Sequence, residues 1–149
     1  MAADPPVTPP IRWRIRLRTA PEAVFAALDQ PDGRRRFWAE SAEELGPGSI
    51  EFRFTDGQVC CSRVLERIPP HRFSITYFQG SVATFTLEPD GLGGTDLHLT
   101  EHGVPPESWS DNHAGWVSVL LALKAAVDFD EDLRNHDSRR TWTAGYVDV

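Results

Sequence analysis

Hydrophobic and polar residues alternate without interruption along the stretch IRWRIRLR, residues 11–18. In an extended chain the four apolar residues face one side and the four arginines face the other. A period of two is typical of a strand with one buried and one solvated face. The pattern therefore predicts a β-strand over 11–18 whose arginine face lies in water, as in an antiparallel sheet with one wet side.

Two short helices are expected after this strand. Pro21 suits the first turn of a helix, and the apolar residues at 24, 25 and 28 have helical spacing. The stretch PDGRRRFW then interrupts the chain and predicts a second short helix that carries Phe37 and Trp38. The three arginines at 34–36 are interpreted as a solvated turn.

Five further stretches alternate with a period of two and predict five more strands. They are centred on residues 50–54, 59–68, 73–77, 83–87 and 97–101, and turn sequences such as TDG and EPDGLGGT separate them. Together with residues 11–18 they give a sheet of about six antiparallel strands.

The long apolar run after the last strand predicts a helix from about Ser110, a good N-cap, to about Arg134. At 100° per residue its bulky residues form one stripe: Trp116, Leu120, Leu123 and Val127. Small residues form a second stripe beside it: Gly115, Val119, Ala122 and Ala126. Lys124, Asp128, Glu131 and Asp132 fall opposite. Small residues permit either close packing on the sheet or a space beneath the helix, and the density of protein cores favours close packing.

Length and charge narrow the class of protein. The chain has 149 residues, which suits one domain, and its formal net charge of −7 argues against nucleic acids and anionic membranes as partners. Its apolar segments are too short to span a membrane, and the first twenty residues lack the apolar core of a secretory signal, so we expect a cytoplasmic protein. Residues 1–10 are predicted to be disordered, 11–135 to form the domain, and 136–149 to form a flexible polar tail.

Three stretches in this order resemble the START-like (SRPBCC) superfamily, which has the helix-grip fold. They are TAPEAVFAALDQPDGRRRFW, VLERIPPHRFSITYF, and GGTDLHLTEHGV followed by GWVSVLLALK. The set is similar in particular to the bacterial single-domain branch named for the activator of the ninety-kilodalton heat-shock chaperone's ATPase, over residues 11–135. The resemblance implies an α+β fold in which a curved antiparallel sheet wraps around the long C-terminal helix, with two short helices after the first strand.

The resemblance also implies a cavity between the long helix and the concave sheet. We therefore expect a protein that binds a small hydrophobic or amphipathic molecule, such as a lipid, polyketide or flavonoid. Two alternatives are a cyclase, dehydratase or hydrolase acting in the same cavity, and a chaperone-associated module that binds a protein partner. No cofactor, nucleic-acid partner or membrane insertion is expected. No metal is expected either, since His98 and His102 have the parity opposite to Leu97 and Leu99 and are predicted to face solvent.

Two polar residues, Glu101 and Arg63, are candidates for the ligand site. Glu101 has the inward parity of Leu97 and Leu99, so it could act as a general base at the cavity mouth, or it could lie in water if the strand end is exposed. Arg63 points inward to pair with Glu101 or a ligand unless a bulge reverses its strand. His113 is predicted to lie on the helix surface. The other candidate ligand-binding residues are apolar: Trp13, Trp38, Phe52, Tyr77, Phe85, Leu99, Gly115, Trp116, Val119, Leu120 and Leu123.

Overall fold

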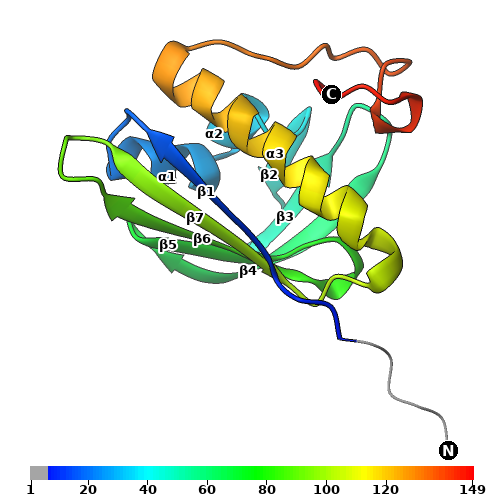
Figure 1. Cartoon of the computed structure of the whole chain (residues 1–149), viewed down its shortest axis with the longest axis horizontal. Coiled ribbons are helices and arrows are strands. Elements are labelled where there is room, and N and C mark those ends of the chain that lie inside the picture. Colours follow the sequence, from blue (N-terminus) through cyan, green and yellow to red (C-terminus); the bar gives the residue numbers. More distant parts are fainter. Residues whose placement is uncertain (1–6) are drawn as a thin grey trace, which may run out of the picture.

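The computed structural model describes residues 7–149, which fold into one curved antiparallel sheet crossed by a long helix (Figure 1). Within this range the sheet has seven strands in the order β1-β7-β6-β5-β4-β3-β2. The strands are β1 Ile11–Leu17, β2 Ser41–Glu44, β3 Ser49–Arg53, β4 Val59–Ile68, β5 Arg72–Thr76, β6 Val82–Pro89 and β7 Thr95–His102. The helices are α1 Pro21–Asp29, α2 Pro31–Arg35 and α3 Pro106–Phe129, with 3₁₀ turns η1 Phe78–Gly80 and η2 Trp142–Ala144.

The predicted α+β helix-grip architecture is confirmed, and the sheet has one strand more than expected. The additional strand, β2, is short and polar, and of its four residues only Ala42 is buried, so it carries little hydrophobic signal. It forms because β3 provides an antiparallel partner for it. Helix α2 ends at Arg35, so Phe37 and Trp38 follow the helix rather than belonging to it.

Helix α3 begins and ends earlier than predicted. Pro106 occupies its first turn, where a missing N–H costs nothing, so the helix starts four residues before Ser110. It ends at Phe129, and Asp130 takes a left-handed conformation with φ 55°. Residues up to Arg134 therefore lie outside the helix.

The C-terminal end of α3 is fixed to the start of the domain by Asp128. The wheel placed this residue on the polar side, but its side chain is fully buried. Its carboxylate accepts hydrogen bonds from the backbone N–H groups of Arg18 and Thr19 and from the Thr19 hydroxyl. Burial acts to raise the pKa of Asp128, but these donors outweigh it, so the pKa is lowered. This end of α3 is thus held close to the β1–α1 connection.

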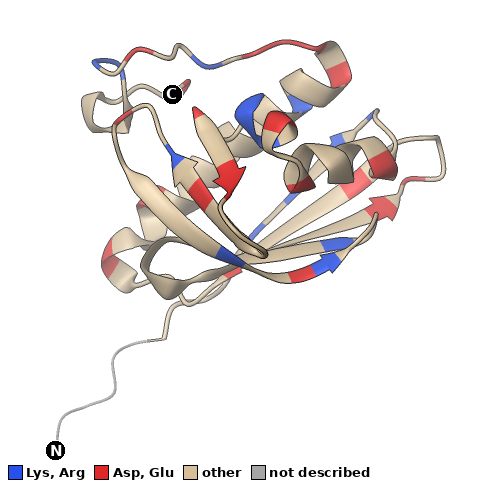
Figure 2. Ribbon diagram, turned by 180° about the vertical axis from the view of Figure 1, so that it is seen from behind, with Lys and Arg blue, Asp and Glu red and all other residues tan. Residues whose placement is uncertain are grey.

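The core lies between the concave face of the sheet and the three helices. Buried residues alternate with more exposed ones along β1, β6 and β7, as the period of two predicts, whereas in β5 the polar Ser74 is buried as well as Phe73 and Ile75. Acidic and basic residues are interspersed over the strands and helices seen in Figure 2. Within residues 7–149 no helix combines the length and the apolar character needed to cross a membrane.

The described residues of both end segments contact the domain. Of the segment 1–10, which was predicted to be disordered, residues 1–6 lie outside the described residues. Within the remaining part, the Thr8 hydroxyl donates a hydrogen bond to the Val104 carbonyl. At the other end, residues 130–149, which we call the tail, fold back beside α3 (Figure 1). The backbone N–H of Asn135 bonds the Asp148 carbonyl, and Thr141 is buried.

Arg34 is buried, contrary to the expectation of a solvated turn. Its side chain is 0% exposed and donates hydrogen bonds to the backbone carbonyls of Leu28, Asp29 and Ala42 at 2.6–3.1 Å. One guanidinium therefore joins the end of α1 and strand β2 to α2. Burial lowers the pKa of Arg34, so the carbonyls compensate a real desolvation cost.

We predict that Arg34→Lys lowers the free energy of unfolding by about 2–4 kcal/mol, because an ammonium cannot reach carbonyls on both sides and leaves buried acceptors unpaired. Chemical denaturation measures this value. Arg35→Lys is the control, since Arg35 is exposed and paired only with Asp32, and it should change stability by less than about 0.5 kcal/mol. Equal effects of the two substitutions would contradict the prediction.

Candidate functional site

A cavity of about 1150 Å³ lies along the first half of α3. Its other walls are residues 37–39 after α2, the β3–β4 turn, the η1 segment between β5 and β6, and the tail. Apolar side chains line most of it: Phe37, Trp38, Ala39, Phe54, Tyr77, Phe78, Ala114, Trp116, Val117, Val119, Leu121, Ala122, Leu133, Trp142, Val147 and Val149.

Three aromatic rings form the inner wall of this cavity. The Tyr77 and Trp116 ring centroids are 5.2 Å apart, and those of Trp38 and Trp116 are 6.0 Å apart. The indole N–H of Trp38 donates a hydrogen bond of 3.0 Å to the Tyr77 hydroxyl. Burial raises the pKa of Tyr77, so its phenol stays neutral. The inner wall is therefore aromatic and uncharged.

Glu101 lies directly behind Trp116 and is 0% exposed. Its inward parity was predicted correctly, and the alternative of a carboxylate in water is wrong. One carboxyl oxygen accepts the Trp116 indole N–H at 2.8 Å and the Asn112 amide at 3.4 Å, and the other accepts the Ser81 hydroxyl at 2.6 Å. Glu101 is not among the residues that line the cavity. It therefore holds the Trp116 ring in place from behind.

The predicted site residues divide into three groups. Five line the cavity: Trp38, Tyr77, Gly115, Trp116 and Val119. Six more are buried beside or behind it: Phe52, Phe85, Leu99, Glu101, Leu120 and Leu123. Trp13 and Arg63 lie elsewhere.

Arg63 is exposed on the outer face of β4, so the structure does not bring it to Glu101. Cys60 and Ser62 occupy the buried positions of this strand, and the irregularity of β4 lies beyond them, between Val64 and Glu66. The backbone N–H of Arg63 donates to the Thr76 hydroxyl. The residue is a surface position of the sheet.

Trp13 packs against the first turns of α3 rather than in the cavity. Its ring stacks on His113 with a centroid distance of 4.6 Å, and Trp109 stacks on His113 from the same helix at 4.8 Å. The Trp13 indole N–H also donates to the His113 carbonyl at 2.9 Å. His113 is thus half-buried between two indoles, not a surface residue, and this stack fixes the start of α3 to β1.

Sequence reasoning missed the cavity residues from the turns and the tail. Phe54 and Phe78 belong to the tips of two hairpins, and Trp142 and Val147 come from the tail. A Cβ added at Gly115 would lie 3.8 Å from the Trp142 ring. The sequence offered two signals of this wall, namely the isolated Trp142 in a polar segment and Gly115 within a helix. That these two residues lie together depends on how the tail folds back, which the sequence pattern does not indicate.

A metal centre is not formed by the described residues. In the range 7–149, His, Cys, Asp and Glu side chains make no cluster of three or more that could hold an ion. The polar groups at the cavity are instead scattered along its rim, as on Thr55, Gln58, Ser108 and Asn112. Such an arrangement can orient the polar group of an amphipathic molecule through single hydrogen bonds.

Comparison with solved structures gives the same fold at low sequence identity. The Aha1 dimer of Colwellia psychrerythraea is 24% identical, with a TM-score of 0.74, and the match covers 83% of this chain and 99% of that one. Protein MLL2253 of Mesorhizobium loti is 23% identical, with a TM-score of 0.72 and the same coverage. DynU16, a putative protein in the dynemicin biosynthetic locus, is 18% identical, with a TM-score of 0.72 over 82% of this chain and 48% of that one.

No curated protein matches the chain. The model of the family described as "Activator of Hsp90 ATPase homolog 1-like protein" matches residues 18–128, which include α1, α2, strands β2–β7 and nearly all of α3. This stretch is most of the chain and contains both Glu101 and Trp116. The protein therefore belongs to the Activator of Hsp90 ATPase homolog 1-like family, within the START-like helix-grip fold.

Proposed function

We propose that this protein binds a small hydrophobic or amphipathic molecule in the cavity beside the first half of α3. The observation that carries the proposal is the volume of about 1150 Å³ together with its aromatic inner wall. Ligand pockets usually measure about 300–1,000 Å³ and combine apolar walls with a few polar groups. This cavity is large enough for a ligand of several fused rings.

The shape of the wall favours a flat ligand. Trp38, Tyr77 and Trp116 provide an aromatic inner wall, and the ring of Trp142 lies near Gly115 on the tail side of the cavity. Stacked aromatic contacts contribute about 0.5–1.5 kcal/mol each beyond the area they bury. A polycyclic aromatic or polyketide-like molecule fits this chemistry better than a flexible acyl chain.

Binding is favoured over catalysis by the surroundings of Glu101. Both of its carboxyl oxygens already accept hydrogen bonds, from Trp116 and Asn112 on one side and Ser81 on the other. Trp116 lies between it and the cavity. A general base must reach the proton that it removes, so the role of Glu101 is to position the wall.

We predict that the neutral probe N-phenyl-1-naphthylamine binds the cavity with increased fluorescence, and that Gly115→Phe weakens its binding at least about tenfold. The new side chain would project from α3 toward Trp142, into the space that the ligand needs. Fluorescence titration gives the affinity, and chemical shift mapping gives the location of the probe.

Two variants control this experiment. Gly115→Ala should keep the affinity and raise the free energy of unfolding by about 0.5–1 kcal/mol, because its Cβ meets only ordinary contacts. Ser110→Phe adds the same ring to the exposed side of α3, outside the cavity, and should leave binding unchanged. Equal affinity of Gly115→Phe and Ser110→Phe would contradict the proposed site.

We also predict a graded loss of stability at Glu101. Glu101→Gln keeps an acceptor for the Trp116 indole and should cost about 1 kcal/mol, whereas Glu101→Ala leaves buried donors unpaired and should cost about 2–4 kcal/mol. Denaturation midpoints and the Trp116 indole N–H resonance measure the two effects. The matched control is Glu107→Gln, an exposed residue of the first turn of α3. If Glu101→Ala cost no more than this control, the positioning role would be wrong.

A further inference from the structure

The tail, residues 130–149, forms one whole side of the cavity. Apolar groups of Leu133, Trp142 and Val147 face the same space as Val117 and Leu121 of α3. In Figure 1 the tail leaves the end of α3 and runs back along the helix toward the β2–β3 end of the sheet. A ligand that enters between α3 and the tail must therefore pass the tail or displace it.

The apolar contacts of the tail are sparse. Trp142 remains 39% exposed and Val147 69% exposed, so the tail buries little apolar surface when it docks. Segments with few buried contacts open at a small fraction of the free energy of global unfolding. Polar contacts must therefore contribute much of what holds the tail in place.

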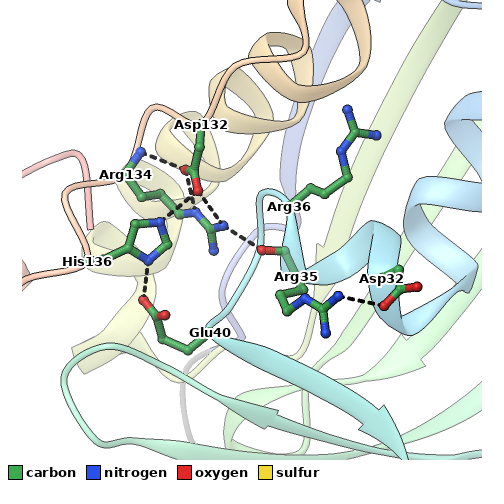
Figure 3. A pocket seen from close by; sticks show the side chains of 7 residues that line it. All are labelled: Asp32, Arg35, Arg36, Glu40, Asp132, Arg134 and His136. Carbon is green, nitrogen blue, oxygen red and sulfur yellow. Dashed lines mark hydrogen bonds and ion pairs between the residues drawn. The ribbon is translucent and has the colours of Figure 1, made fainter.

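These polar contacts converge on His136 (Figure 3). Its Nδ1 lies 2.6 Å from a carboxylate oxygen of Glu40, in the connection between α2 and β2, and its Nε2 lies 2.7 Å from Asp132. Two residues away, the Arg134 guanidinium donates to the carbonyls of Ala39 and Arg35. The tail is thus attached to the body of the domain at one charged cluster.

The backbone on both sides of this cluster is in an uncommon conformation. Asp130 and His136 have φ of 55° and 56°, in the left-handed region that residues other than Gly rarely adopt. Each such residue costs of order 1 kcal/mol and persists only while surrounding contacts hold it. Loss of the His136 contacts would therefore release strain as well as a hydrogen bond.

We propose that the tail is a cover over the ligand cavity and that protonated His136 is the latch that keeps it closed. The latch rests on the cluster itself; its relevance to ligand entry rests on the proposed function. Release of the latch would let the tail swing away from α3 between Asp130 and His136 and open the space beneath Trp142.

The sign of the pH dependence follows from the charges around the ring. Hydrogen bonds to Asp132 and then Glu40 raise the pKa of His136, against burial and the nearby Arg134. The pKa of Asp132 is lowered to about 2 and that of Glu40 is also lowered, so both carboxylates stay charged near neutral pH. The other charged side chains of the cluster are Arg35, paired with Asp32, and Arg36, paired with Asp130.

Glu40 belongs to the body of the domain and Asp132 to the tail itself, so the Glu40 contact is the part of the raised pKa of His136 that docking adds. Docking therefore gains stability that is complete below pH 6.5, the ordinary pKa of His, and is lost as the pH rises through the docked value. The tail is therefore expected to be closed at mildly acidic pH and to open more often at alkaline pH.

Hydrogen exchange of the full-length protein tests the latch. Protection factors of tail amides, such as those of Asn135 and Tyr146, are measured at pH 6 and pH 9 and corrected for intrinsic exchange. We expect protection about two- to fivefold lower at pH 9, which is the effect of one partly exposed ion pair. His136→Asn should give low protection at both values, since Asn tolerates the left-handed conformation but cannot become charged.

The matched control is His71→Asn in the exposed β4–β5 turn, which should keep the wild-type pH dependence. Equal protection at both pH values in the wild type, or an unchanged pH dependence in His136→Asn, would overturn the proposal.

Stopped-flow association of N-phenyl-1-naphthylamine should also be slower at pH 6 than at pH 9 in the wild type only. A probe that fails to bind would count against the proposed function and leave the exchange result standing, whereas binding at one rate at both pH values would overturn the role of the tail in ligand entry.

Discussion

The hydrogen bond between Trp116 and Glu101 determines how α3 sits on the sheet. At its other end the helix is held to the β1–α1 connection by Asp128, and the small residues Ala125 and Ala126 are buried there. At Trp116 an entire indole lies between the helix and β7. Its N–H is paired because the carboxylate of Glu101 on β7 accepts its hydrogen bond. A buried indole without an acceptor would cost about 1–3 kcal/mol. The same bond therefore both permits the bulky residue and fixes its orientation.

This arrangement explains why a well-packed core and a large cavity occur in one small domain. The rings of Trp38, Tyr77, Phe85 and Trp116 pack against one another and fill the space between helix and sheet. The free space begins on the far side of these rings, where α3 faces the hairpin tips and the tail rather than the strands. The small residue Gly115 lies on this side, and a side chain of the tail, Trp142, covers it.

Period and parity predicted much of the fold, because they depend on neighbours in the sequence. The alternation of residues 11–18, the bulky stripe of α3 and the inward direction of Glu101 all follow from one-residue geometry. Arg34, Trp13 and His113 could not be placed this way. Their partners lie on other elements: the carbonyl of Ala42 for Arg34, and residues 100 positions apart for Trp13 and His113. The cavity walls formed by the hairpin tips and the tail also depend on contacts between residues far apart in the sequence. Five of the predicted residues therefore line the cavity, whereas the residues of its outer side were not predicted.

A crystal structure of the protein with N-phenyl-1-naphthylamine tests the central claim most directly, namely that the space bounded by α3, the hairpin tips and the tail is a ligand site. We expect the probe to stack against Trp116 and Tyr77, with Trp142 on its opposite face and the Trp116–Glu101 hydrogen bond intact. A probe bound only on the outer face of the sheet, with the cavity closed by its own side chains, would contradict it.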